Sequence, residues 1–144
     1  MAHTPFPGSP LPPDDAAATI ERFRGAFRIH TAGRHPRIPT WCAFPDAGAR
    51  YEWDDLPALF AALPPALVFY NEHGPHPNVW LASPAAILAF FTAKEPWEQR
   101  DFYVFDASCR WCLCVTHDDA VLTCGEPLPG ADPRQGESSP APPA

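Results

Sequence analysis

A run of alternating side chains between residues 110 and 116 constrains the fold more than any other part of the sequence. Its even positions hold small or polar residues and its odd positions hold large apolar ones: Arg110, Cys112, Cys114 and Thr116 against Trp111, Leu113 and Val115. A period of two is typical of a β-strand, whose successive side chains point to opposite faces of a sheet. Tight turns are predicted on either side, at DASC (106–109) and HDDA (117–120), so residues 101–126 are expected to form a three-stranded antiparallel meander.

A first helix is predicted over residues 13–30, PDDAAATIERFRGAFRIH. Its apolar residues recur at positions i, i+3 and i+7 and form one face: Ile20, Phe23 and Phe27. Asp14 or Asp15 is expected to cap the helix, and Gly33 and Pro36 are expected to end it.

Further periodic segments complete the predicted domain. Helices are expected at 54–63 and at 84–94, the second opened by a Ser-Pro pair, and short strands at 41–44, 51–53, 66–71 and 78–83. This order predicts the α+β class: one domain with an antiparallel sheet, its C-terminal meander packed against two or three helices.

Prolines crowd both ends of the chain, mixed at the C-terminal end with glycine and serine. Such segments bury too little apolar surface to offset the entropy cost of ordering the backbone. The sequence therefore predicts disordered tails at 1–13 and 127–144 around a single domain at 14–126.

The chain has no apolar run of the roughly 18 residues that a membrane span requires, and its first residues do not form a secretory signal. Its five cysteines, an odd number, argue against a disulfide framework. A reducing, cytoplasmic location is expected.

The charge of the body is strongly acidic. The chain carries a formal net charge of −7, and between residues 38 and 126 twelve acidic residues against four basic ones give −8. Such a body repels nucleic acid and anionic membranes and favours basic protein partners. The same charge also confers solubility, and the sequence leaves the oligomeric state open.

Thiols and histidines gather near the meander, and they raise the question of a metal site. Cys109 and Cys112 have the spacing of one ligand pair, but Cys124 stands alone and no second pair follows. The alternation of the strand instead predicts that Cys112 and Cys114 pack in the core. His73 and His76 flank a Gly-Pro turn, so no metal or other cofactor is expected from the sequence.

A catalytic site is not expected either. His117 stands beside Asp118 and Asp119, but no serine or cysteine lies in a strained strand-to-helix turn, and no glycine-rich phosphate loop is present. The competing interpretation is a small metal- or thiol-dependent enzyme built on Cys109, Cys112 and His117.

Carboxylates at the ends of predicted elements are expected to project into solvent and to attract a basic partner, and two tryptophans beside them are candidate anchors. The predicted partner-binding residues are Trp53, Asp54, Asp55, Glu72, Trp97, Asp118 and Asp119.

The segments VWLASPAAILAFF, DFYVFDASCRWCLCV and THDD, within residues 79–126, resemble small bacterial proteins of the polymorphic-toxin immunity type. That resemblance implies a non-catalytic inhibitor that binds a toxin or effector. An accessory subunit of a larger assembly is the remaining alternative.

Overall fold

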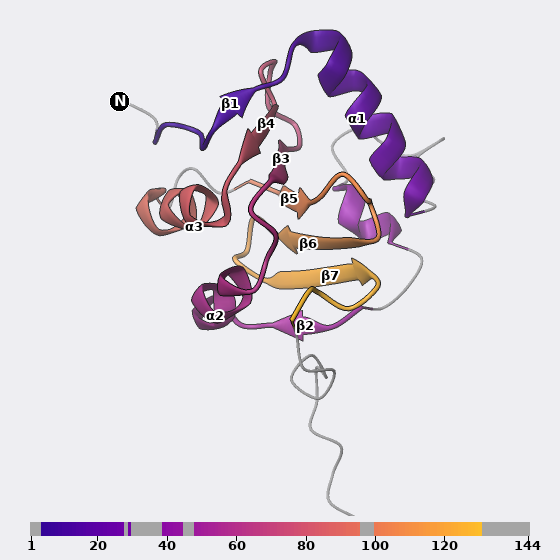
Figure 1. Ribbon diagram of the computed structural model, residues 1–144. Coiled ribbons are helices and arrows are strands. Elements are labelled where there is room, and N and C mark those ends of the chain that lie inside the picture. The colour runs from indigo at the N-terminus through magenta and orange to yellow at the C-terminus, as the bar shows by residue number, and fades with distance from the viewer. Residues whose placement is uncertain (1–3, 28, 30–38, 45–47, 96–99, 131–144) are drawn as a thin grey trace, which may run out of the picture.

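The computed structural model describes residues 4–27, 29, 39–44, 48–95 and 100–130. They form an α+β domain around a seven-stranded antiparallel sheet with the order β1-β4-β3-β5-β6-β7-β2 (Figure 1), which confirms the predicted fold class. The strands are β1 (Ser9–Pro10), β2 (Arg50–Tyr51), β3 (Leu67–Asn71), β4 (Val79–Ala82), β5 (Phe102–Phe105), β6 (Trp111–Val115) and β7 (Val121–Gly125). The last three are the predicted meander.

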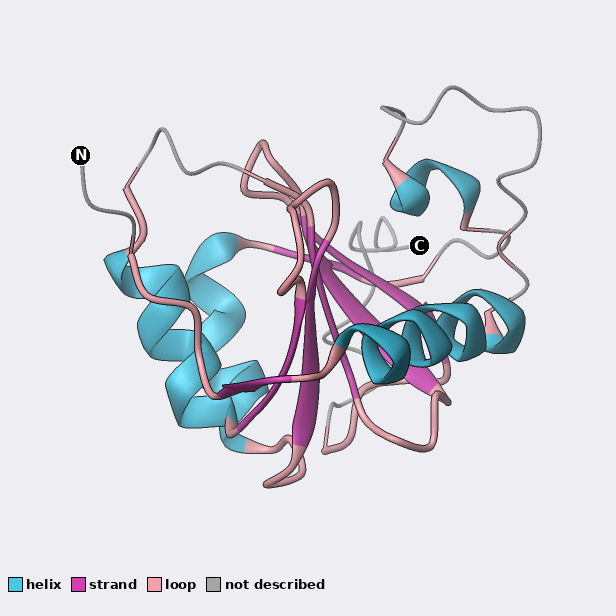
Figure 2. Ribbon diagram, turned by 90° about the horizontal axis from the view of Figure 1, so that it is seen from above, coloured by secondary structure: helices cyan, strands magenta, loops and turns pink. Residues whose placement is uncertain are grey.

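Helices lie on both faces of the sheet (Figure 2). One face packs against α1 (Pro13–Ala26), and the other packs against α2 (Leu56–Ala61) and α3 (Pro84–Ala93). Two short 3-10 helices, η1 (Thr40–Ala43) and η2 (Trp53–Asp55), complete the elements. None of the helices in the described part of the chain is long and apolar enough to cross a membrane.

The face covered by α2 and α3 is built from aromatic rings. Phe69 of β3 contacts Phe90 and Phe91 of α3, with ring centroids 5.4 and 5.9 Å apart, and stacks on Phe102 at 5.2 Å. Burial of each such ring contributes roughly 1.5–3 kcal/mol. The helix begins where predicted, because the Ser83 side chain accepts a hydrogen bond from the third residue of α3.

The face covered by α1 holds the thiols. Cys112 and Cys114 are fully buried there, which confirms the prediction that they pack in the core. Phe23 of α1 stacks on Phe105 with ring centroids 4.7 Å apart. The helix ends at Ala26, earlier than predicted, and Gly33 and Pro36 lie outside the described residues.

Residues 41–44 differ from the prediction. Residues 41–43 belong to η1 and Phe44 caps it, because the backbone N–H groups of Cys42 and Phe44 bond three residues back, to Pro39 and Trp41. The turn brings the Trp41 side chain to one end of the sheet, where it contributes to the site below.

The predicted N-terminal tail is wrong for residues 4–12. Ser9 pairs with Leu81 at the edge of the sheet, and the Phe6 ring stacks on Trp80 with centroids 4.4 Å apart. Gly8 permits this approach, because its φ is +74° and a Cβ there would lie 2.0 Å from the Leu81 carbonyl oxygen. Proline is compatible with such an edge strand, since one side of it needs no N–H donor.

The predicted C-terminal tail is wrong at its start. Leu128 is buried in the core that α2 and α3 cover, with 4% of its surface exposed. Leu128 fills an apolar site in the core, and its burial stabilises the docked segment. The proline-rich composition of the segment does not reveal this contact. Residues 131–144 lie outside the described residues.

Candidate functional site

Four segments that adjoin five strands meet at one end of the sheet. The register pairs Asn71 with Phe102 and Phe102 with Val115, so β3 and β6 end where β5 begins. It also pairs Val121 with both Val115 and Tyr51, which places the start of β7 and the end of β2 at the same level. We call this the acidic end; it comprises residues 52–55, 72–73, 101 and 116–119.

Glu72 follows β3 directly and is buried, with 4% of its surface exposed. Its Oε1 accepts hydrogen bonds from the Thr40 backbone N–H (2.8 Å) and the Tyr103 hydroxyl (2.6 Å), and its Oε2 accepts one from the Thr40 hydroxyl. The prediction that Glu72 projects into solvent is therefore wrong. The carboxylate is tolerated in the interior because each oxygen meets donors, and it ties η1 to the sheet.

Asp101, directly before β5, is the second buried carboxylate and was not predicted. Its Oδ1 accepts hydrogen bonds from the Trp41 indole N–H (2.9 Å) and the His117 backbone N–H (3.0 Å). A sequence feature that could have indicated a buried carboxylate is the position of Asp101 directly before FYVF, a strand whose residues are all buried. That position leaves the carboxyl little access to solvent, so it needs donors from neighbouring loops.

The His117 ring lies between two carboxylates. Its Nδ1 is 3.1 Å from Asp101 Oδ1 and its Nε2 is 3.5 Å from Asp118 Oδ2. The hydrogen bond to Asp101 raises the pKa of His117 above its ordinary 6.5, although partial burial works in the opposite direction. An imidazole held by a carboxylate has the arrangement of the base in a hydrolytic triad.

The nearby thiols are poorly suited to act as nucleophiles with such a base. Burial raises the pKa of Cys114 and of Cys112 well above the usual value, so both thiols stay protonated at neutral pH. The geometry therefore favours packing over catalysis at these residues.

Cys112 lies opposite Cys124 across β6 and β7, and Cys109 is buried in the turn before β6 with a φ of +52°. These thiols belong to the core against α1, whereas His117 is on an exposed turn. The structure thus does not gather Cys109, Cys112 and His117 into a common site facing solvent.

One group in the described part of the chain has the spacing of metal ligands. Oxygen or nitrogen atoms of Glu72, His73 and Asp101 lie within 4.8 Å of one another. Both oxygens of Glu72 already accept hydrogen bonds from Thr40, and Oε1 accepts a second from Tyr103. These hydrogen bonds account for the burial of Glu72 without a cation. His76, in the same loop, is exposed.

On the other side of the acidic end, Lys94 joins two predicted binding segments. Its Nζ lies 5.2 Å from the centre of the Trp53 ring and 3.2 Å from Asp119 Oδ1. Its side chain is only 6% exposed, because Trp53 and Asp119 cover it. Trp53 also packs edge-on against Phe91, so it closes one end of the core and is half-buried.

The remaining predicted carboxylates face solvent. Asp54, Asp55 and Asp118 are exposed, the Asp118 side chain to 79%. Asp55 Oδ2 accepts a hydrogen bond from the Glu52 N–H (2.8 Å), which fixes the start of η2 and the direction of this carboxylate. Trp97 lies outside the described residues.

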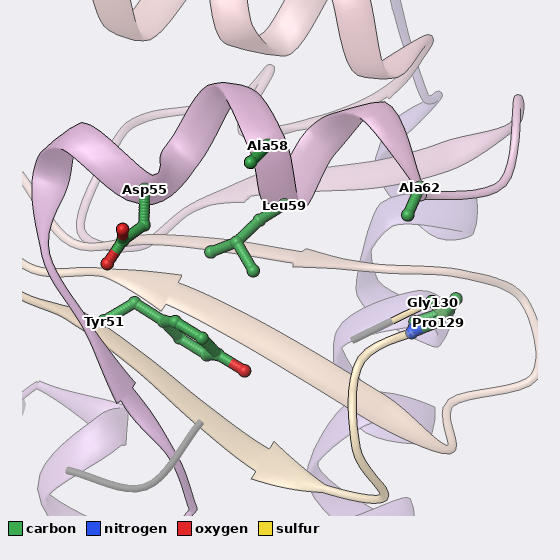
Figure 3. Close-up of a pocket in the computed structure, with 7 residues that line it drawn as sticks. All are labelled: Tyr51, Asp55, Ala58, Leu59, Ala62, Pro129 and Gly130. Atoms are coloured by element: carbon green, nitrogen blue, oxygen red, sulfur yellow. The ribbon is translucent and has the colours of Figure 1, made fainter. Parts of the chain in front are cut away.

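A groove of about 370 Å³ lies between α2 on one side and Tyr51 and residues 129–130 on the other (Figure 3). The Tyr51 ring forms one wall and Leu59 the other, with Asp55 at one end and Pro129 and Gly130 at the opposite end (Figure 3). Partial burial, and then the nearby Asp55, raise the pKa of Tyr51. The groove therefore combines apolar walls with a carboxylate at its mouth.

Comparison with known proteins adds no functional lead: no protein-family model, curated protein or solved structure matches the chain.

Proposed function

We propose that this chain is a non-catalytic, acidic protein-binding module that neutralises a basic toxin or effector, as immunity proteins do. The supporting observation is the arrangement of charge at the acidic end. Asp54, Asp55 and Asp118 are exposed, while Lys94, between these segments, is covered and paired with Asp119. The local surface thus keeps a negative charge that steers basic partners and repels acidic ones.

The groove along α2 supplies a contact of matching chemistry. A lysine or arginine side chain of the partner would lay its apolar stem between Tyr51 and Leu59 and bring its charge to Asp55. Trp53, half-buried on Phe91, adds a rigid aromatic surface elsewhere at the acidic end. We expect the encounter to take place in the cytoplasm, where the five thiols stay reduced.

Two other functions receive less support. An enzyme using Cys109, Cys112 and His117 would need an activated thiol, and Cys112 is buried with a raised pKa. An accessory subunit would also use a binding surface, but it would form a permanent assembly whose interface is more apolar than this acidic end.

The test is capture of the partner from the native host with the full chain as bait. The captured protein should be basic, should inhibit growth when expressed alone, and should lose that inhibition when this chain is co-expressed. An acidic partner, or a basic one without growth inhibition, contradicts the proposal.

A matched pair of variants localises the effect. Neutralising Asp54, Asp55 and Asp118 to asparagine should weaken protection. The control neutralises the same number of exposed carboxylates on α1, with Asp14→Asn, Asp15→Asn and Glu21→Gln, and should protect like the wild type. Equal loss of protection in both triple variants would show that protection depends on the net charge of the protein and not on the acidic end.

A further inference from the structure

A second cavity, of about 380 Å³, lies between the N-terminal segment, α3 and the loop after β3. We call it the aromatic pocket. Four aromatic residues from separate parts of the chain line it: Phe6, Trp80, Phe90 and Phe102. Cavities of this size and apolar character are typical of small-molecule sites, which generally also hold a few polar groups for orientation.

The aromatic walls are held firmly. Phe6 stacks on Trp80 at 4.4 Å and on Phe90 at 5.3 Å, with planes 22° and 26° apart. Phe90 in turn packs edge-on against Phe102 at 5.3 Å. Phe6 is nevertheless 37% exposed, so its ring forms the outer wall of the pocket.

Asn71, which lines the same pocket, has an unsatisfied polar atom in its side chain. Strand alternation places its side chain on the face of Phe69, which packs against α3, and Asn71 lines the pocket. The residue is 2% exposed, yet its Oδ1 has no hydrogen-bond partner among the described residues. A buried amide oxygen without a donor is costly, and this cost is relieved when a ligand donates to it.

The charge at the mouth of the pocket limits the ligand further. Arg100 and His76 line it, and no carboxylate does so among the described lining residues. Aromatic rings around a carboxylate would favour a cationic ligand. In this pocket the guanidinium of Arg100 lies beside the aromatic walls instead, and it favours an anionic group on the ligand.

We propose that the aromatic pocket binds a small planar aromatic molecule with an N–H or O–H donor for Asn71 Oδ1 and a carboxylate for Arg100. Phe6, Trp80, Phe90 and Phe102 would enclose the ring. This site is separate from the proposed partner surface, and the proposal holds whether or not the chain neutralises a toxin.

The test compares pairs of aromatic ligands in which only one member has an N–H or O–H donor on the ring, by calorimetric titration of the full chain. Indole-3-acetate should bind about tenfold more tightly than 1-naphthylacetate, and 4-hydroxyphenylacetate more tightly than phenylacetate, because only the first of each pair can donate to Asn71. Indole-3-acetamide, which lacks the negative charge, should bind more weakly than indole-3-acetate.

Variants assign each preference to its residue. Asn71→Leu should abolish the preference for the donor-bearing member of each pair, and Arg100→Gln should abolish the preference for the acetate over the amide. Leu81→Ser, at an exposed position outside the pocket, should bind all probes as the wild type does.

The measurements on the wild-type chain decide the matter even if a variant folds poorly. Absence of saturable binding at millimolar concentrations, or equal affinity for the members of both donor pairs, overturns the proposal. Preferences that persist unchanged in a folded Asn71→Leu protein overturn it as well.

Discussion

The acidic end carries two sets of carboxylates in opposite environments. The inner set, Glu72 and Asp101, is buried and accepts hydrogen bonds from η1 and the β6–β7 turn. The outer set, Asp54, Asp55 and Asp118, is exposed. All five follow or precede strands or helices, so position along the chain does not separate them. The two sets differ in whether another segment covers the carboxylate and donates hydrogen bonds to it.

This difference assigns the two sets different tasks. Removing a buried acceptor leaves donors unpaired and destabilises the fold, whereas removing an exposed carboxylate changes the field around the protein with little effect on stability. Variants of the inner set should therefore lower the free energy of unfolding, whereas variants of the outer set should mainly change the rate of association with a partner.

The largest effect is expected at Glu72. Replacement by leucine leaves the Thr40 N–H, the Thr40 hydroxyl and the Tyr103 hydroxyl without an acceptor in a buried site. We expect a loss of about 3 kcal/mol in the free energy of unfolding, measured by urea denaturation.

Glu72→Gln is the matched control, because the amide keeps an acceptor oxygen and the side-chain volume. It should lose clearly less stability than Glu72→Leu. Equal and small losses in both variants would show that the inner carboxylate does not hold η1 on the sheet.

A smaller effect is expected for the thiol beside the inner set. Cys114→Ser places a more polar hydroxyl in a fully buried site and should cost about 1–2 kcal/mol. Cys42→Ser, at an exposed position, should stay within about 0.5 kcal/mol. A neutral Cys114→Ser would indicate that the α1 face is loosely packed.

A still smaller effect on stability is expected from His117, whose ring lies between Asp101 of the inner set and Asp118 of the outer set. Its folded-state pKa lies above the ordinary 6.5 because of Asp101, so its protonated form stabilises the fold. That contribution is fully present below pH 6.5 and is lost as the pH rises through the folded-state pKa. The imidazole is 46% exposed, so solvent screening keeps the change small.

An NMR titration of the His117 ring checks this interaction. The wild-type pKa should exceed 6.5, and Asp101→Asn should lower it because the neutral amide no longer favours the imidazolium. An unchanged pKa in the variant would assign the shift to another group, such as Asp118.

Local patterns predicted most of the fold. Alternation gave β6 and its buried thiols, and the Ser83-Pro84 pair gave the start of α3, because these features depend on residues a few positions apart. The exposure of the outer carboxylates could be predicted for the same reason: they lie in short turns where acidic residues are common.

The hydrogen bonds of the inner set could not be predicted because they join segments that are far apart in the sequence. The bond from Thr40 to Glu72 spans 32 residues, and the bond from Trp41 to Asp101 spans 60. Phe6 docks on Trp80 in a similarly non-local contact. Periodicity and turn chemistry carry no information about which loop covers which strand end.

The smallest effect on stability is expected for the outer set. The triple variant Asp54→Asn, Asp55→Asn, Asp118→Asn should unfold within about 0.5 kcal/mol of the wild type, because exposed charges contribute little and asparagine can still cap η2. A loss above about 2 kcal/mol would place these carboxylates with the inner set.

The association rate with the captured partner, measured at low and high ionic strength, tests most directly the claim that the outer set meets the partner. The wild-type rate should fall steeply with salt, and the outer triple variant should associate about tenfold more slowly at low salt with a flatter dependence. The α1 triple control should remain close to the wild type. Identical rates and salt dependences for the wild type and the outer variant would contradict the account.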